Sequence, residues 1–222
     1  MTPINKIVFL PGNGCGDIQR ANWYATAAAA LRSRFGESIE VICETMPDPD
    51  VAQRSIWLPH MSRVFRCDEQ TLVVGHSSGA VAAMRFLETA KLGAVVLVSA
   101  YLTDGGNECE RASGYFEDDW KFATQKQNCL RRIVQFGSTD DPFLPIEEQD
   151  LISAQLGATY HRFDHRGHFM TRQFPDLVLE IVRLVEEKGD DSAAPAPAPA
   201  PAALDLAPDE DDDATSPSSE HE

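Results

Sequence analysis

The sequence predicts an α/β fold, in which about six parallel strands form one sheet with helices on both of its faces. The first observation is that short, almost wholly apolar runs recur along the chain, for example Lys6–Leu10 and Gly93–Val98. Strands buried on both faces of a parallel sheet have this composition. The second observation is that runs of helical periodicity lie between them, as alternating strand–helix units require.

Each strand is assigned to an apolar run bounded by polar or turn-forming residues. The predicted strands are Lys6–Leu10, Ile39–Cys43, Thr71–Val74, Gly93–Val98, Arg132–Phe136 and Ala158–Phe163. The predicted helices are Trp23–Arg34, Ser55–Phe65, Ala80–Thr89, Glu147–Leu156 and Gln173–Lys188. We expect the strands to lie in the spatial order 2-1-3-4-5-6, numbered along the chain.

Charge divides the 222-residue chain into a folded part and a tail. The net charge is −16, and from Gly189 onward there are ten acidic residues and no Lys or Arg. The remainder has 25 acidic and 19 basic residues, a net charge of −6. Ala and Pro alternate from Ala194 to Ala202, which is typical of an extended linker that buries no core. We therefore predict a domain at residues 1–188 and a disordered tail at residues 189–222.

Composition also limits the compartment and the partners. Met1–Lys6 leads into the first strand without a secretory apolar segment, and no apolar run is long enough to span a membrane. The five cysteines are scattered and include no Cys-x-x-Cys pair, a pattern of reduced thiols. We expect a monomer in the cytoplasm or nucleus. The acidic charge argues against nucleic-acid binding.

The segment Gly75-His76-Ser77-Ser78-Gly79 joins a predicted strand to a predicted helix. A Gly-x-Ser-x-Gly segment in this context is typical of a nucleophile elbow, a cramped turn that exposes the central serine. The alternative is an ordinary strand–helix turn in which two hydroxyls cap the helix. In the elbow interpretation Ser77 is a nucleophile, and the N–H of Ser78 faces a developing oxyanion.

Pro11-Gly12-Asn13-Gly14-Cys15-Gly16 follows the first strand and is rich in glycine. It is not a phosphate-binding loop, because no Lys-Ser/Thr follows and the glycines miss the dinucleotide spacing. A loop at this position donates the second oxyanion N–H in folds with a nucleophile elbow. Asn13 and Gly14 are both candidates for that donor.

A serine nucleophile needs a histidine base and a carboxylate that orients the base, and in this fold they follow in the order Ser, acid, His. Two neighbouring candidates for the acid, Asp140 and Asp141, come directly after the fifth strand. We choose Asp141, where a segment braced by prolines begins, and treat Asp140 as a turn-capping alternative.

We choose His168 as the base, because it follows Gly167 and precedes the last helix. His161 and His165 are alternatives, and with His168 they raise the further alternative of a zinc site. The spacing matches no structural zinc pattern and no Cys lies nearby, so we expect no metal and no organic cofactor. His76, inside the elbow, is expected to pack or to support the catalytic residues rather than act as the base.

The segment from Tyr101 to Asn128 is long for a simple crossover and carries aromatic residues beside charged ones. Insertions after strands at the carboxyl edge of a parallel sheet form pocket walls. We expect this segment to line the substrate side of the site. A solvated loop and helix with a few core aromatics is the alternative.

Several strings of the sequence closely resemble the retinoblastoma-binding protein 9 family of small serine hydrolases. They include GHSSGAVAAMR from Gly75, ERASGYF from Glu110 and VQFGSTDDPFLP from Val134. The resemblance covers about Ile7 to Val185. It implies an α/β-hydrolase fold without a large cap domain, and ester or amide cleavage with a triad of Ser77, Asp141 and His168.

The resemblance also suggests a second kind of function. The family takes its name from binding the retinoblastoma protein through a Leu-x-Cys-x-Glu motif, and the matching site here is Phe65-Arg66-Cys67-Asp68-Glu69. The alternative hypothesis is thus an interaction protein that binds such a pocket protein through Phe65–Glu69 or through the acidic tail.

Overall fold

The computed structural model describes residues 2–187, so the predicted tail at residues 189–222 lies outside the described residues. One sheet of six strands forms its centre, in the order β2-β1-β3-β4-β5-β6, and every neighbouring pair is parallel. The strands are β1 (Lys6–Leu10), β2 (Glu40–Ile42), β3 (Thr71–His76), β4 (Ala94–Val98), β5 (Ile133–Ser138) and β6 (Thr159–Phe163). The predicted strand number, direction and order are confirmed.

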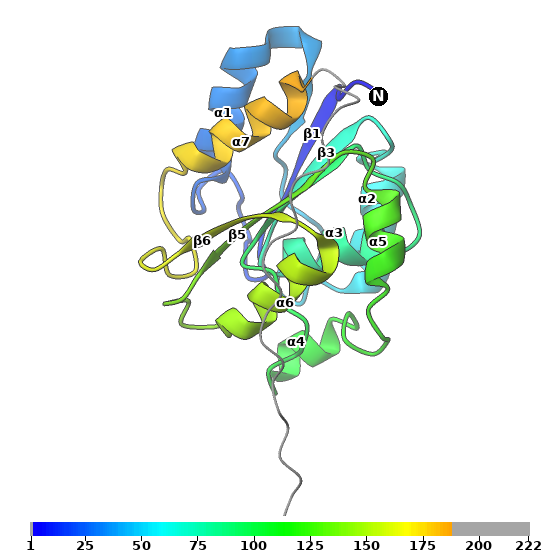
Figure 1. Cartoon of the computed structure of the whole chain (residues 1–222), viewed down its shortest axis with the longest axis vertical. Helices are drawn as coiled ribbons and strands as arrows, with labels where there is room; N and C mark the ends of the chain where they lie inside the picture. The colour runs from blue at the N-terminus through cyan, green and yellow to red at the C-terminus, as the bar shows by residue number, and fades with distance from the viewer. Residues whose placement is uncertain (1, 188–222) are drawn as a thin grey trace, which may run out of the picture.

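Helices cover both faces of the sheet (Figure 1). Helices α1 (Tyr24–Phe35) and α7 (Pro175–Glu186) lie together on one face, where one of two apolar clusters forms. The other cluster lies on the opposite face, beneath α2 (Arg54–Arg63), α3 (Ser78–Phe86) and α6 (Ile146–Leu156). The remaining helices are the short η1 (Gly36–Ser38), α4 (Glu108–Ala112) and α5 (Phe122–Asn128).

The central strands are apolar because they are covered twice. Every residue of β3, β4 and β5 is buried, whereas the edge strand β6 is only partly buried. The last helix shows the complementary pattern: Leu177, Ile181 and Leu184 are buried at helical spacing, and Leu179 faces outward. A buried sheet between two helical layers follows from these two periodicities.

Helix boundaries differ from the predicted ones by a few residues. Helix α3 begins at Ser78, directly after the elbow, rather than at Ala80. Helix α7 begins at Pro175 rather than at Gln173, since proline is suited to the first helical turn, where its missing N–H costs nothing. No helix within residues 2–187 has the length and apolarity that a membrane span needs.

Candidate active site

The Gly75–Gly79 turn has the backbone conformation of a nucleophile elbow. Ser77 has φ 54° and ψ −122°, a conformation that L-residues rarely adopt. A Cβ on Gly75 would lie 2.4 Å from the Gly79 carbonyl oxygen, and one on Gly79 would lie 2.2 Å from the carbonyl oxygen of Leu10. Both glycines are therefore required by backbone contacts, as the cramped turn predicts.

The loop after β1 packs directly on the predicted nucleophile. A Cβ on Gly12 would lie 3.2 Å from the Ser77 Cβ. The backbone N–H of Asn13 donates to Ser78 Oγ at 3.3 Å, beside the elbow. The N–H of Gly14 instead donates to the Pro49 carbonyl at 2.7 Å. Both predicted donors line the pocket, but the N–H of Gly14 is occupied by Pro49, and the N–H of Asn13 lies against the elbow.

Asp141 and His168 form the predicted acid–histidine pair. The Nδ1–H of His168 donates to Asp141 Oδ2 at 2.8 Å, and the Ser99 hydroxyl donates to the same oxygen at 2.9 Å. The other oxygen, Oδ1, accepts the backbone N–H groups of Phe143 and Leu144 at 3.0 and 3.2 Å. The carboxylate is fully buried, and four donors satisfy it.

These donors decide the charge of Asp141. Burial alone raises the pKa of its carboxyl group, but the hydrogen bond and charge of His168 oppose it, aided by Phe143 and Ser99. The net effect is a pKa below the ordinary value. Asp141 is therefore ionised at neutral pH and holds the Nδ1 proton of His168. This leaves Nε2 of His168 as the nitrogen that can accept a proton.

Asp140, the alternative acid, has another role. Its Oδ1 accepts the N–H of Gly167 at 2.8 Å and that of Arg166 at 3.2 Å. It also accepts the Ser138 hydroxyl at 2.6 Å. Asp140 therefore fixes the loop that carries His168, and Gly167 permits the turn there with φ 51°. Two adjacent aspartates thus orient the histidine, one through its ring and one through its backbone.

His76 supports the same histidine through a backbone contact, one of the two roles expected for it. Its Nε2–H donates to the His168 carbonyl at 2.9 Å, so its Nδ1 carries no proton and accepts from the Tyr24 hydroxyl at 2.6 Å. Burial, and after it the nearby His168, lower the pKa of His76 to about 3. His76 is therefore neutral and joins the elbow to the histidine loop.

The two alternative histidines, His161 and His165, do not gather around His168. His161 lies on the edge strand β6, where its ring stacks on Phe136 with a centroid distance of 4.7 Å and its Nε2 lies 3.6 Å from Glu180 Oε1. His165 is exposed in the loop that also carries His168. Among residues 2–187, no group of three or more His, Cys, Asp or Glu side chains is placed to hold a metal ion.

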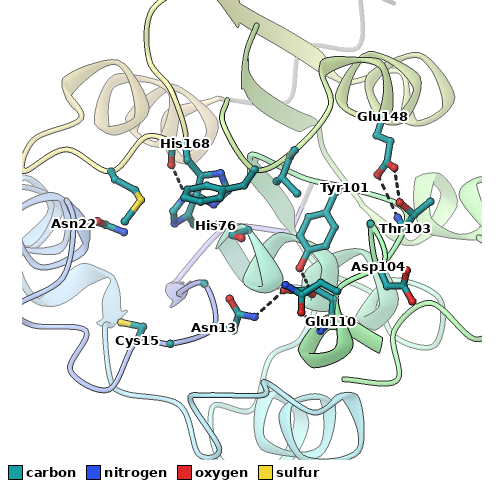
Figure 2. Close-up of a pocket in the computed structure, with 18 of the residues that line it drawn as sticks. Asn13, Cys15, Asn22, His76, Tyr101, Thr103, Asp104, Glu110, Glu148 and His168 are labelled. Carbon is teal, nitrogen blue, oxygen red and sulfur yellow. Dashed lines mark hydrogen bonds between the residues drawn. The ribbon is translucent and has the colours of Figure 1, made fainter. Parts of the chain in front are cut away.

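Ser77 and His168 open into one pocket of about 530 Å³. Figure 2 shows His76 and His168 near its centre, with Tyr101, Asp104, Glu110 and Glu148 on one side. Among the described residues, the lining includes three carboxylates, Asp104, Glu110 and Glu148, and no Lys or Arg. Phe143 and Met170 contribute exposed apolar surface to the lining.

The first half of the segment from Tyr101 to Asn128 forms the pocket wall, as predicted. Tyr101, Asp104 and Glu110 all line the pocket. The second half is anchored by Arg85, a fully buried residue of α3 whose guanidinium donates to the carbonyl oxygens of residues 115, 118 and 119. The same guanidinium lies 3.7 Å from the ring centroid of Trp120. The wall is therefore attached to the helix that follows the nucleophile.

The Phe65–Glu69 segment is not arranged as a docking motif. Phe65 is 2% exposed and Cys67 is 9% exposed, and both belong to the apolar core. Burial raises the pKa of the Cys67 thiol to about 12, as expected for a thiol in the core. Two of the three side chains that define the Leu-x-Cys-x-Glu motif are therefore inaccessible in this conformation, whereas Glu69 is exposed.

Comparisons with known proteins agree with this geometry. A family model described as serine hydrolase matches residues 14–174. The serine hydrolase RBBP9 of Rattus norvegicus is 47% identical over 178 residues, which cover 80% of this chain and 94% of that protein. The crystal structure of the Bacillus subtilis ydeN product has a TM-score of 0.73 at 19% identity, covering 82% of this chain and all of that one. Zea mays acyl-protein thioesterase 2 has a TM-score of 0.54 at 14% identity, covering 83% and 95%. The two structures share the α/β-hydrolase fold, and the family match shows that this chain belongs to the serine hydrolases.

Proposed function

We propose that this serine hydrolase cleaves a small ester or amide through an acyl-serine intermediate, with Ser77 as nucleophile, His168 as base and Asp141 as orienting acid. The observation that carries the proposal is the shared pocket. Ser77, on a strained elbow, and His168, held by a buried carboxylate, line the same cavity. A serine, a histidine and an ionised acid in this arrangement are what acyl transfer requires.

In the first step Ser77 Oγ attacks the substrate carbonyl carbon while its proton passes to Nε2 of His168. The carbonyl π-bond electrons move to oxygen and form an oxyanion. The tetrahedral intermediate then collapses: the bond to the alcohol or amine breaks, and the leaving group takes the proton from His168. Water repeats the sequence on the acyl-serine, which releases the carboxylic acid and restores Ser77.

The oxyanion needs two donors that are already in place. Ser78 is the first residue of α3, and its backbone N–H donates to no acceptor within residues 2–187. Apart from the 3.3 Å contact with Ser78 Oγ, the N–H of Asn13 has no hydrogen-bond acceptor within residues 2–187. We assign these two N–H groups to the oxyanion hole. Removing one such donor typically lowers kcat by about 10²–10³-fold.

The experiment is labelling with a fluorophosphonate probe, followed by peptide mass analysis. We expect one adduct on Ser77 that is lost in Ser77→Ala and strongly slowed in His168→Ala. His165→Ala is the matched control, since it removes an exposed histidine from the same loop. Labelling of Ser77→Ala at the wild-type rate, or no labelling of folded wild-type protein, would show that the assignment is wrong.

A further inference from the structure

Glu110 lies in the pocket wall and contacts two segments that are far apart in the sequence. It belongs to α4, and its Oε1 accepts the side-chain amide of Asn13 at 2.7 Å. Its Oε2 accepts the Tyr101 hydroxyl at 2.5 Å. Figure 2 shows both hydrogen bonds. No Lys or Arg is among the partners of this carboxylate in the described chain, so neutral donors alone hold it.

These contacts continue into a closed ring in which every donor can be assigned. Tyr101 has one hydroxyl proton, which it gives to Glu110, because a carboxylate only accepts. Burial and then Glu110 raise the pKa of Tyr101, so this proton stays on the phenol at neutral pH. The Tyr101 oxygen, 3.2 Å from Ser78 Oγ, must therefore accept the serine proton. Ser78 Oγ in turn accepts the Asn13 N–H, which closes the ring.

The ring joins the two residues that carry the oxyanion donors. Asn13 follows β1 and Ser78 begins α3, and besides their direct contact, Tyr101 and Glu110 of the pocket wall link the two residues. Oxyanion stabilisation requires both N–H groups within about 2.7–3.1 Å of one oxygen position. We propose that Glu110 is a positioning residue that fixes the spacing of the Asn13 and Ser78 N–H groups. This inference rests on the proposed acyl-serine function.

The contact between the Asn13 N–H and Ser78 Oγ is weak enough to leave this N–H available to a bound substrate. At 3.3 Å it is longer than an ordinary N–H···O hydrogen bond. Turning this N–H toward a developing oxyanion therefore costs little, provided that the Asn13 side chain remains held. The Asn13 amide keeps its 2.7 Å bond to Glu110 without using the backbone N–H, so the two functions do not compete.

The main test is Glu110→Leu. Leucine offers no acceptor to the Asn13 amide or to the Tyr101 hydroxyl, so both hydrogen bonds to residue 110 are lost and the ring breaks. For a neutral ester we expect kcat to fall about 10–100-fold, less than the loss of a whole oxyanion donor, while KM changes less than about threefold. Affinity for a boronic acid that forms a tetrahedral adduct with Ser77 should fall with kcat.

Glu148→Leu is the matched control. Glu148 lines the same pocket, but it accepts from the backbone N–H of Leu102 and from Thr103, not from the oxyanion residues. It removes the same charge, so the fall in kcat for Glu110→Leu should exceed that for Glu148→Leu by about tenfold. Tyr101→Phe breaks the ring at another bond, and its effect combined with Glu110→Leu should be less than additive.

The outcomes separate this inference from the proposed function. If fluorophosphonate does not label wild-type Ser77, the function itself fails. If Ser77 is labelled and folded Glu110→Leu keeps the wild-type kcat, only the positioning role is overturned. The role is equally overturned if Glu110→Leu raises KM for an amine-bearing ester and leaves kcat and boronate affinity unchanged, because Glu110 then binds substrate.

Discussion

Asp141→Asn replaces one oxygen of a fully buried carboxylate by an amide nitrogen, and the neighbouring donors determine which one. Oδ1 accepts two backbone N–H groups, from Phe143 and Leu144, which cannot move away. The asparagine oxygen is therefore expected to remain there. The NH₂ group then replaces Oδ2 and faces His168 Nδ1 and the Ser99 hydroxyl.

An amide donor at this place reverses the tautomer of His168. Nδ1 has to accept, so the proton lies on Nε2, which can no longer take a proton from Ser77. The same substitution in a chymotrypsin-type triad lowers kcat about 10⁴-fold, which corresponds to about 5 kcal/mol of transition-state stabilisation. We expect a loss of about 10³–10⁴-fold here, with a nearly unchanged melting temperature, because the shape of the side chain is kept.

The assay is steady-state hydrolysis of a neutral nitrophenyl ester at pH 7, with near-UV circular dichroism to verify the fold. Asp140→Asn is the control, because its Oδ1 can keep all three of its donors as an amide oxygen. It should lower kcat by roughly tenfold or less. A loss of kcat under tenfold in Asp141→Asn, or a loss of kcat in Asp140→Asn that exceeds the loss in Asp141→Asn, would refute the assignment of the acid.

Three further predictions follow from the same contacts. Gly79→Ala should lower the free energy of unfolding in urea by about 3 kcal/mol or more, because the new Cβ would lie 2.2 Å from the Leu10 carbonyl oxygen. Gly16→Ala is the control, since its Cβ would have no atom within 4 Å, and it should change the free energy of unfolding by less than about 1 kcal/mol. Similar values for the two variants would contradict the elbow packing. Because burial lowers the pKa of His76 to about 3 while an unfolded histidine titrates near 6.5, the unfolded chain binds one more proton between these values and stability falls as the pH falls. In His76→Asn, the slope of unfolding free energy against pH from 6 to 4 should therefore decrease by about 1.4 kcal/mol per unit, and an unchanged slope would mean that His76 is charged in the fold. Because the described pocket lining has three carboxylates and no Lys or Arg, esters of anionic acids should have lower kcat/KM than neutral isosteres, most clearly at low salt. Glu148→Gln should reduce this difference. Equal kcat/KM values for the two kinds of ester in the wild type would argue against an electrostatic preference.

Sequence reasoning succeeded where one local rule decides the structure. Strands buried on both faces have to be apolar, so their number and order could be predicted from short runs. The elbow could be predicted because Gly75 and Gly79 face backbone atoms that leave no room for a Cβ. The choice of His168 depended on Gly167, whose φ of 51° permits the turn before the histidine.

Features that depend on contacts between distant segments could not be predicted. The sequence offers no reason to prefer Asn13 or Gly14 as the oxyanion donor. The fold brings the Pro49 carbonyl to the N–H of Gly14, whereas the N–H of Asn13 makes a longer contact with Ser78 Oγ. The bond between Glu110 and Asn13 joins residues 97 positions apart. Likewise, no periodicity indicated that Cys67 is buried, because its segment joins α2 to β3 without regular structure.

The central claim is that Ser77 carries the acyl group during turnover, and rapid-quench mass spectrometry of a nitrophenyl ester reaction tests it directly. The account predicts a burst of about one nitrophenol per protein molecule and a transient acyl mass on the peptide that contains Ser77. Both should disappear in Ser77→Ala. Steady turnover with the acyl group on another residue, or full turnover by Ser77→Ala, would contradict the account.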